Sequence, residues 1–314
     1  MKVVITDYEY QNVETERKIV TDAGMTLEDY QVKDEEGLIE ATRDADAVIV
    51  QYACITRAVI EKMRRCRAII RYGIGINNID INAAAERGIY VCNIPDYGID
   101  EVSNHAVAGI LALSRGLSVS NRALRQGLWA YTPVKPLRRF NQCAVGILGY
   151  GRMGRMVAHK LSSFGVRLLA NDILPKQPLD AGVEIVDFDT LLRESDFLTL
   201  HCPLYEKTRH IINAQAFAKM KRGAYLINTS RGAVVEETAL INALNTGILA
   251  GAAIDVFEDE PIGADHPLLA MPQVIATPHT AWYSEQSIEA LQRKAALEAV
   301  NILQGNPPYH ACKP

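Results

Sequence analysis

A cluster of glycines near the middle of this 314-residue chain does most to restrict what it can fold into. The apolar segment 143–148 leads into Gly149, Gly151 and Gly154, which form a Gly-x-Gly-x-x-Gly pattern. In a strand-to-helix turn, the first glycine allows the tight turn, the second lets a pyrophosphate approach the backbone, and the third lets the helix pack closely. The N-terminus of such a helix is an anion site. Taken alone, the pattern fits a glycine-rich turn without a ligand equally well.

The residues that follow the glycines favour a bound dinucleotide. After a predicted helix over 152–164, the strand-like segment 166–171 ends at Asp172, where the adenosine ribose of a dinucleotide lies in such folds. A carboxylate there accepts hydrogen bonds from both ribose hydroxyls and repels a 2′-phosphate. The sequence therefore predicts NAD as the cofactor, bound in preference to NADP. The alternative is that Asp172 is an ordinary turn residue.

Composition argues against several other classes of protein. A net charge of -4 gives no reason to expect nucleic acid or a membrane surface as a partner, and the apolar run at 3–5 is too short for a signal peptide. The six cysteines are scattered without a Cys-x-x-Cys pair, which predicts neither a zinc site nor a disulfide framework. No two histidines have metal-ligand spacing on one helix face, so no catalytic metal is expected. We expect a cytoplasmic protein with reduced thiols.

Short strands and helices alternate along the chain, which predicts parallel α/β sheets. In the first part, strands are expected at 2–6, 46–51, 67–71 and 88–92, with helices near 35–43, 56–64 and 78–87. A long apolar helix at about 99–118 follows, and then strands near 143–149, 166–171, 183–186, 196–200, 224–228, 250–254 and 273–276. The last helix, about 283–304, comes too late for the second sheet and is expected to return to the first domain. Two such crossings would form a hinge, with substrate and cofactor meeting in the cleft.

Three polar residues in the second half of the chain follow predicted strands. Arg231 comes after 224–228, Glu260 after 250–254 and His279 at the end of the last strand. Singly, Arg231 fits a surface arginine and Glu260 a solvated turn residue. Because the carboxyl ends of parallel strands share one edge of a sheet, the three side chains can also converge. Arg can hold a carboxylate, His can exchange a proton near neutral pH, and Glu beside His stabilises the imidazolium form.

These motifs resemble the NAD-dependent D-2-hydroxyacid dehydrogenase family. Besides the glycines with Asp172, the matching segments are NTSRGAVV at 228–235, DVFEDEP at 255–261 and TPH at 277–279. The segments AWYSEQ at 281–286 and RYGIGINNID at 71–80 look most like the C-terminal-binding-protein branch and its bacterial relatives. Many members carry Asp where this chain has Asn77, so no role is assigned to a charge there.

The resemblance implies a fold and its domain boundaries. We expect an α/β fold with two Rossmann-like doubly wound domains, in which the nucleotide-binding domain is inserted into a flavodoxin-like substrate domain. The substrate domain is predicted over 1–98 and 283–314, and the NAD-binding Rossmann domain over 99–282.

The resemblance also implies roles for individual residues. The expected catalytic residues are Arg231, Glu260 and His279. The residues expected to bind substrate are Arg71, Tyr72, Gly73, Ile74, Gly75 and Trp282. The residues expected to contact the cofactor are Ser103, Gly149, Gly151, Arg152, Met153, Asp172, His201, Cys202, Pro203, Thr208, Thr229, Ser230, Arg231, Asp255 and His279. His105 is a further candidate for the cofactor cleft, whereas His159, His210, His266 and His310 fit helix, loop or tail positions.

The implied reaction is reversible hydride transfer between NAD(H) and the C2 carbon of a D-2-hydroxy acid or 2-oxo acid. Arg231 and the backbone at 73–75 would hold the substrate carboxylate, while His279, supported by Glu260, would exchange the hydroxyl proton. The alternative from another class is an NAD-sensing corepressor or peptide-binding module of the C-terminal-binding-protein type, which retains the same three residues. Among enzymes, a phosphoglycerate dehydrogenase and a hydroxypyruvate or glyoxylate reductase stay open.

Two aromatic segments lead to further predictions. Residues 120–139 are expected to continue the long helix into an arm that bears Trp129 and Tyr131, and exposed aromatics on an arm are typical of an interface. Relatives dimerise through this region, so we expect a homodimer. Trp282, three residues after His279, is expected to wall the substrate pocket and to favour medium-sized, partly apolar 2-oxo acids over phosphorylated ones. The alternatives are that each tryptophan only packs on its own domain or hinge.

Overall fold

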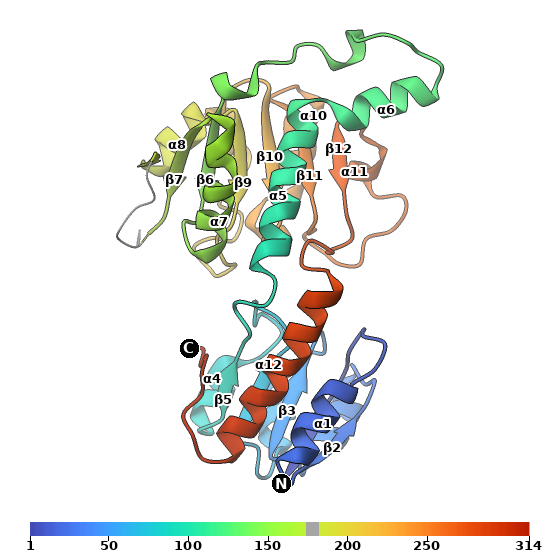
Figure 1. The fold of residues 1–314 in the computed structure, drawn as a ribbon, viewed down its shortest axis with the longest axis vertical. Helices are drawn as coiled ribbons and strands as arrows, with labels where there is room; N and C mark the ends of the chain where they lie inside the picture. The colour runs from blue at the N-terminus through green and yellow to red at the C-terminus, as the bar shows by residue number, and fades with distance from the viewer. Residues whose placement is uncertain (174–181, 314) are drawn as a thin grey trace. The chain divides into compact units, whose positions relative to one another are not determined.

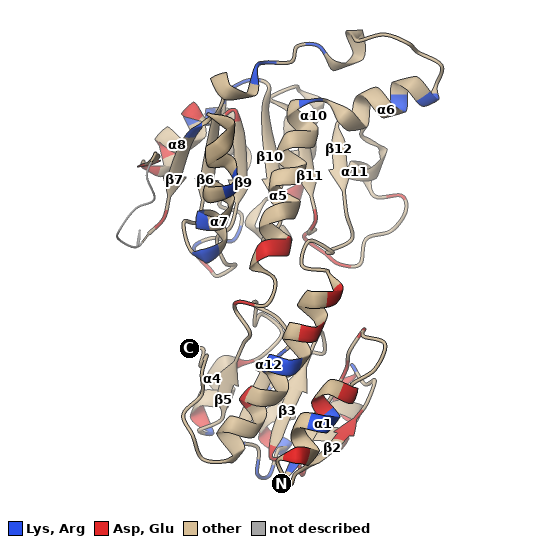
Figure 2. Ribbon diagram, in the orientation of Figure 1, with Lys and Arg blue, Asp and Glu red and all other residues tan. Residues whose placement is uncertain are grey.

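The computed structural model describes residues 1–173 and 182–313. The chain divides into two compact units, each built on its own parallel sheet (Figure 1). Unit 1 consists of Met1–Gly98 and Ser284–Pro314, and unit 2 of Ile99–Tyr283. Lys and Arg residues are interspersed with Asp and Glu residues along both units (Figure 2). Among the described residues, no helix is both long enough and apolar enough to span a membrane.

Unit 1 is a five-stranded sheet with helices packed on it. Its strand order, β2-β1-β3-β4-β5, is that of flavodoxin-like folds. The strands are β1 Lys2–Ile5, β2 Thr26–Asp29, β3 Ala47–Val50, β4 Ala68–Arg71 and β5 Tyr90–Cys92, and the helices are α1 Glu14–Asp22, α2 Glu35–Thr42, α3 Arg57–Lys62, α4 Ile81–Glu86 and α12 Glu285–Leu303. The inner strands are short apolar runs that are almost completely buried, as expected for a parallel sheet covered on both faces.

Two elements of unit 1 were not expected from the sequence. Helix α1 has the sequence ETERKIVTD, in which only two buried positions, Glu16 and Val20, mark the inner face. Strand β2 is a polar edge strand, TLED, with a single fully buried residue. Neither segment has the apolar run or periodicity by which the other elements are identified. Helix α12 packs against α1, β3 and β4, and a capping box formed by Ser284 and Ser287 starts it.

Unit 2 is a seven-stranded sheet. The stretch β8-β7-β6-β9-β10-β11 has the doubly wound order of dinucleotide-binding folds, and β12 extends it at one edge. The strands are β6 Ala144–Leu148, β7 Arg167–Asn171, β8 Val183–Ile185, β9 Phe197–Leu200, β10 Ala224–Asn228, β11 Leu249–Ile254 and β12 Val274–Ala276. The α-helices are α5 Ile99–Ser114, α6 Leu117–Arg125, α7 Arg152–Leu161, α8 Phe188–Glu194, α9 Ala214–Lys219, α10 Glu237–Asn245 and α11 Pro267–Ala270. The predicted fold class is confirmed.

The segment that joins α5 to the glycine strand differs from the prediction. The prediction of a single helix over 99–118 that continues into 120–139 is wrong. Helix α5 ends at Ser114, and Gly116 adopts a left-handed φ of 58° before α6 begins. Glycine adopts that conformation without steric cost, so it breaks the helix there. Helix α6 and the residues after it extend beyond the sheet of unit 2 (Figure 1). In this segment Trp129 is 89% exposed and Tyr131 is 69% exposed.

Candidate active site

The three glycines that follow β6 form a cradle with room at its centre. A Cβ on Gly149, whose φ is 92°, would lie 2.6 Å from the backbone nitrogen of Cys202, and one on Gly154 would lie 2.2 Å from the carbonyl oxygen of Gly149. Around Gly151, by contrast, a Cβ would meet no atom within 4 Å. Close packing therefore requires the first and third glycines, whereas the second leaves open space where a phosphate can approach the N-terminus of α7.

Asp172 lies beside the same glycine loop. It follows β7, and its Oδ2 accepts a hydrogen bond of 2.6 Å from the backbone N–H of Tyr150. The carboxylate thus ties the end of β7 to the residue between the first two glycines. This is the strand end at which a ribose-binding carboxylate is found in dinucleotide-binding folds.

Two buried polar atoms just past the ends of β9 and β10 have no hydrogen-bond partner within the described part of the chain: Nδ1 of His201 and Oγ1 of Thr229. They follow β9 and β10, and the backbone of His201 lies against Gly149. The other ring nitrogen of His201 is 2.9 Å from the hydroxyl of Thr199, and burial lowers the pKa of His201 to about 4, so the ring is neutral at physiological pH. Buried polar atoms are normally hydrogen-bonded, so this edge fits a polar ligand that supplies the missing bonds.

Two other residues predicted to contact the cofactor have their hydroxyls engaged within the protein. Ser103 is fully buried; its Oγ donates to the carbonyl of Ile99 at 2.6 Å and accepts from Nζ of Lys160 at 2.8 Å. Thr208 donates to the carbonyl of Pro203 at 2.6 Å and accepts the N–H of Tyr205 at 2.9 Å. Both hydroxyls therefore stabilise local structure. Of the remaining predicted cofactor residues, Arg152 and Pro203 are exposed, Met153 and Ser230 half-buried, and Cys202 buried.

Glu260 and His279 form a hydrogen-bonded pair. Nδ1 of His279 is 2.7 Å from Oε2 of Glu260, and about a third of each side chain is exposed, 30% and 35% respectively. Burial raises the pKa of the Glu260 carboxyl, but the hydrogen bond and charge of His279, the N–H of Phe257 and the positive charge of Arg231 outweigh it and hold that pKa below its usual value. With Nδ1 bonded to Glu260, Nε2 is the ring nitrogen left for a substrate.

The loop that carries His279 is held by the buried carboxylate of Asp255. One oxygen, Oδ1, accepts the hydroxyl of Thr277 at 2.5 Å and the N–H of Thr280 at 2.9 Å, and Oδ2 accepts the N–H of Ala281 at 2.9 Å. The N–H of His279 donates to the carbonyl of Asp255 at 2.8 Å. In this setting His279 adopts a left-handed φ of 53°. Asp255 was expected to contact the cofactor, but its oxygens are used to position this loop.

Arg231 completes the predicted catalytic set. Strands β10, β11 and β12 are neighbours in the sheet, so the residues that follow them lie along one edge, as the sequence predicted. The backbone of Arg231 is fixed by Nδ2 of Asn228, which donates to its carbonyl at 3.0 Å. Its Nη1 donates to the carbonyl of Ser230 at 2.6 Å. The structure therefore brings Arg231, Glu260 and His279 together within unit 2.

In unit 1, the predicted substrate residues lie at the end of β4, where Arg71 is the last residue of the strand, and in the loop that follows it. Gly73 has a φ of 133°, a backbone conformation that residues with a side chain rarely adopt, and the guanidinium of Arg71 lies over it. The guanidinium carbon lies 6.0 Å from the ring centre of Tyr52. Ile74 is 38% exposed. The loop thus presents a close-packed backbone turn and an arginine.

Tyr72, which was expected to bind substrate, has its side chain buried in unit 1. Its side chain is 1% exposed, and its hydroxyl donates to Oε1 of Glu16 at 2.5 Å. The ring packs edge-on against Tyr10, with ring centres 5.4 Å apart. Tyr72 therefore supports the loop from the core. In unit 2, Trp282 is half-buried and packs edge-on against Tyr283, with ring centres 6.0 Å apart.

Sequence reasoning did not identify a second buried carboxylate, that of Asp7. Asp7 is fully buried two residues after β1 and accepts three backbone N–H groups, from Gln51 at 3.1 Å, Tyr52 at 2.6 Å and Ala53 at 3.1 Å. It organises the loop after β3 as Asp255 organises the loop after β12. The sequence feature that could have indicated this role is the position of Asp7 just after the first apolar strand.

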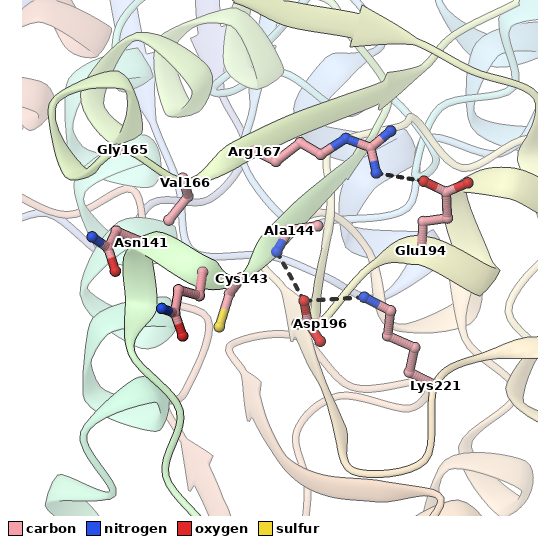
Figure 3. Close-up of a pocket in the computed structure, with 10 residues that line it drawn as sticks. Asn141, Cys143, Ala144, Gly165, Val166, Arg167, Glu194, Asp196 and Lys221 are labelled. Carbon is pink, nitrogen blue, oxygen red and sulfur yellow. Dashed lines mark hydrogen bonds and ion pairs between the residues drawn. The ribbon is translucent and has the colours of Figure 1, made fainter.

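A cavity of about 420 Å³ lies at the opposite end of the same sheet, where β6, β7 and β9 begin (Figure 3). Its charged side chains are paired with one another: Arg167 with Glu194 at 2.5 Å, and Lys221 with Asp196 at 3.1 Å. Asp196 also accepts the N–H of Ala144 at 2.9 Å. None of the predicted site residues lines this cavity, so it is separate from the candidate active site.

Comparison with known proteins identifies the family. Residues 107–281 match the D-isomer specific 2-hydroxyacid dehydrogenase family, NAD binding domain. The chain belongs to this family. It is 39% identical to a glyoxylate reductase of Korarchaeum cryptofilum over 85% of this chain and 81% of that protein. It is 34% identical to a D-3-phosphoglycerate dehydrogenase of Methanocaldococcus jannaschii over 97% of this chain, but it spans only 58% of that relative's length.

The solved structures agree with this assignment. A D-lactate dehydrogenase from Aquifex aeolicus, crystallised with NAD and lactic acid, superimposes with a TM-score of 0.89 at 29% identity, over 97% of this chain and 96% of that one. The predicted family, the NAD cofactor and the class of NAD-dependent oxidoreductases acting on D-2-hydroxy acids are therefore confirmed. The resemblance to the C-terminal-binding-protein branch stays a prediction.

Proposed function

We propose that this chain catalyses reversible hydride transfer between NAD(H) and the C2 carbon of a D-2-hydroxy acid or 2-oxo acid. The observation that carries the proposal is the pairing of His279 with Glu260, 2.7 Å apart, at the edge of an NAD-binding sheet that also presents Arg231. A 2-oxo acid has a carboxylate, which an arginine can bind, and a carbonyl oxygen, which a histidine paired with a carboxylate can protonate.

The residues proposed to hold NAD surround the glycine cradle. Gly151 leaves room for the pyrophosphate at the N-terminus of α7, and Asp172 would accept the ribose hydroxyls. The unpartnered atoms of His201 and Thr229 would bond to polar groups of the cofactor. When bound, the nicotinamide supplies or accepts the hydride.

The three catalytic residues would divide the remaining work. Arg231 would bind the substrate carboxylate through its planar guanidinium. His279 would donate a proton from Nε2 to the substrate oxygen in reduction and remove it in oxidation. Glu260, whose pKa is lowered by its surroundings, would hold the ring through Nδ1 and stabilise its positive charge.

We infer a medium-sized, partly apolar 2-oxo acid as the preferred substrate. The inference rests on Trp282, which follows the His279 loop and offers a large apolar face. Because the matching relatives include a glyoxylate reductase and a D-3-phosphoglycerate dehydrogenase, small and phosphorylated acids are the alternative substrates to test. A panel of 2-oxo acids with NADH, including glyoxylate, hydroxypyruvate and 3-phosphohydroxypyruvate, distinguishes them by kcat/KM. No turnover of any member would refute the enzymatic proposal and favour an NAD-sensing binding module.

The preference for NAD over NADP is proposed on the position of Asp172. Replacement by serine keeps a small polar side chain but removes the charge that repels a 2′-phosphate. We expect the unmodified protein to bind NADH far more tightly than NADPH, and Asp172→Ser to narrow that difference. Fluorescence titration with the two cofactors measures both dissociation constants, and equal constants in the unmodified protein would contradict the proposal.

We further propose a homodimer in the cytoplasm. The dimer proposal is supported by the extended segment that bears Trp129 and Tyr131, 89% and 69% exposed, because large exposed aromatics are typical of interfaces. Light scattering at micromolar concentration should give twice the monomer mass. Replacing both aromatics by serine should shift the mass toward the monomer.

A further inference from the structure

Two histidine–glutamate pairs lie behind the loop that carries Glu260. Nε2 of His210 is 2.5 Å from Oε1 of Glu258, and Nε2 of His266 is 2.9 Å from Oε1 of Glu237. The two pairs join residues of unit 2 that are 48 and 29 positions apart in sequence. The sequence assigned no role to any of the four residues, and the two histidines were among those interpreted as helix, loop or tail positions.

The two pairs interlock through the backbone. The N–H of Glu237 donates to Oε2 of Glu258 and the N–H of Glu258 donates to Oε2 of Glu237, both at 3.4 Å. Nδ1 of His266 accepts the N–H of Leu268 at 3.4 Å, so Nε2 carries the proton that is donated to Glu237. The ring of His266 also packs edge-on against Phe257, with ring centres 5.4 Å apart. The start of α10 and the loop after β11 are thereby joined.

This arrangement fixes the backbone that presents Glu260. The N–H of Phe257 donates to Oε1 of Glu260 at 2.9 Å, so displacing Phe257 displaces the carboxylate. Gly232 packs so closely against this loop that a Cβ there would lie 1.7 Å from the carbonyl oxygen of Phe257. His210 holds Glu258, and its own N–H donates to the carbonyl of Ala233, the residue after Gly232, at 2.8 Å. The loop is thus tied to residues 232–233 both directly and through His210.

We propose that His210 and Glu258 are positioning residues that set the place of Glu260, and through it the orientation of His279. The proposal rests on the proposed dehydrogenase function. The carbonyl of Arg231 accepts a hydrogen bond from Nδ2 of Asn228, a contact that does not involve His210 or Glu258, so we expect loosening the His210–Glu258 pair to affect proton transfer more than binding of the substrate carboxylate.

The first test replaces His210 by alanine and by glutamine. Small displacements of catalytic groups have large effects on rate, so we expect His210→Ala to lower kcat about tenfold, with KM for the 2-oxo acid and Kd for NADH changed less than about twofold. His210→Gln should recover much of the loss, because its amide can still donate to Glu258. The matched control is Glu184→Gln, which breaks an exposed pair with Arg167 and should leave kcat unchanged. Equal losses in kcat and binding would overturn the proposal.

A double-mutant cycle then asks whether His210 acts through Glu260. In a Glu260→Gln background, His210→Ala should cause little further loss of kcat, because the group that it positions has already lost its charge. If His210→Ala lowers kcat by the same factor in both backgrounds, the positioning role is wrong.

A measurement without turnover separates this proposal from the proposed function. The ring-proton resonance of His279, assigned by its disappearance in His279→Ala, should shift in His210→Ala and stay in place in Glu184→Gln. If no 2-oxo acid is turned over but this shift occurs, the proposed reaction fails while the positioning role stands. An unshifted resonance in folded His210→Ala and His210→Gln overturns the positioning role whatever the activity.

Discussion

The two units each place a glutamate next to a loop predicted to contact the substrate, in opposite electrostatic settings. In unit 1, Glu16 is fully buried, and its partners are the neutral hydroxyl of Tyr72 and the amide of Gln292, at 2.5 and 3.0 Å. Burial raises the pKa of Glu16, and these hydrogen bonds offset that rise only in part. In unit 2, Glu260 is about a third exposed and paired with the ionisable ring of His279.

The difference shows that burial and the partner of a carboxyl group together determine what the group can do. Burial favours the protonated form of Glu16, and its two hydrogen bonds, which act against that shift, form a fixed internal crosslink between α1, the loop after β4 and α12. An ionisable partner and a nearby arginine keep Glu260 charged, so it can respond to a proton that arrives on His279. We therefore assign structural support to Glu16 and a role in proton transfer to Glu260.

The largest expected effect comes from removing the partner of each carboxyl group. His279→Ala removes the proposed acid, which typically costs about 10²–10⁴ in rate, so kcat should fall by that factor with NADH binding intact. Tyr72→Phe removes only the hydroxyl that bonds to Glu16, so it should lower the melting temperature while kcat stays within about threefold. Steady-state kinetics and thermal unfolding of both variants measure this. A larger loss of kcat in Tyr72→Phe than in His279→Ala would reverse the assignment.

Neutralising the carboxyl groups themselves gives the next largest effect. Glu260→Gln keeps the shape but loses the charge that orients and stabilises the ring, and we expect kcat to fall about 10²-fold. Glu16→Gln changes a group that we assign to structural support, so its kcat should stay near that of the unmodified enzyme. Similar losses in the two variants would mean that both carboxyl groups act in the same way.

The pH dependence of stability should have opposite signs at the two sites. The raised pKa of Glu16 means that its contribution is fully present below the unfolded pKa and is lost as pH rises through the folded pKa. The lowered pKa of Glu260 means that its contribution is present above the unfolded pKa and is lost as pH falls through the folded pKa. In melting temperatures measured from pH 3 to 8, the melting temperature of Glu16→Gln should therefore rise relative to that of the unmodified protein as pH rises. The stability deficit of Glu260→Gln should shrink below about pH 4.3, the ordinary value for glutamate.

The sequence predicted the arrangement of strand ends better than the directions of side chains. Arg231, Glu260 and His279 were expected together because each follows a strand of one parallel sheet, and adjacent strands place them on one edge. For Tyr72 and Asp255, the motif gave the position along the chain but not which way the side chain faces, and both are buried.

The features that could not be predicted from the sequence were missed for three different physical reasons: a contact between distant segments, narrow apolar faces and a backbone conformation. The pairing of His210 with Glu258 joins residues 48 positions apart, and no local periodicity indicates it. Helix α1 and strand β2 were missed because their apolar faces are only one or two residues wide. The break at Gly116 depends on a backbone conformation that a glycine permits but does not require.

The left-handed backbone of His279 has a consequence for evolution as well as for catalysis. With a φ of 53°, this residue adopts a conformation that costs non-glycine residues about 1–2 kcal/mol, and the hydrogen bonds to Asp255 hold it there. Removing the side chain entirely should relieve that cost, so His279→Gly should melt at a higher temperature than His279→Ala although both lack the acid. Selection for stability alone would therefore favour glycine at position 279. Selection for the proposed proton transfer would keep histidine there.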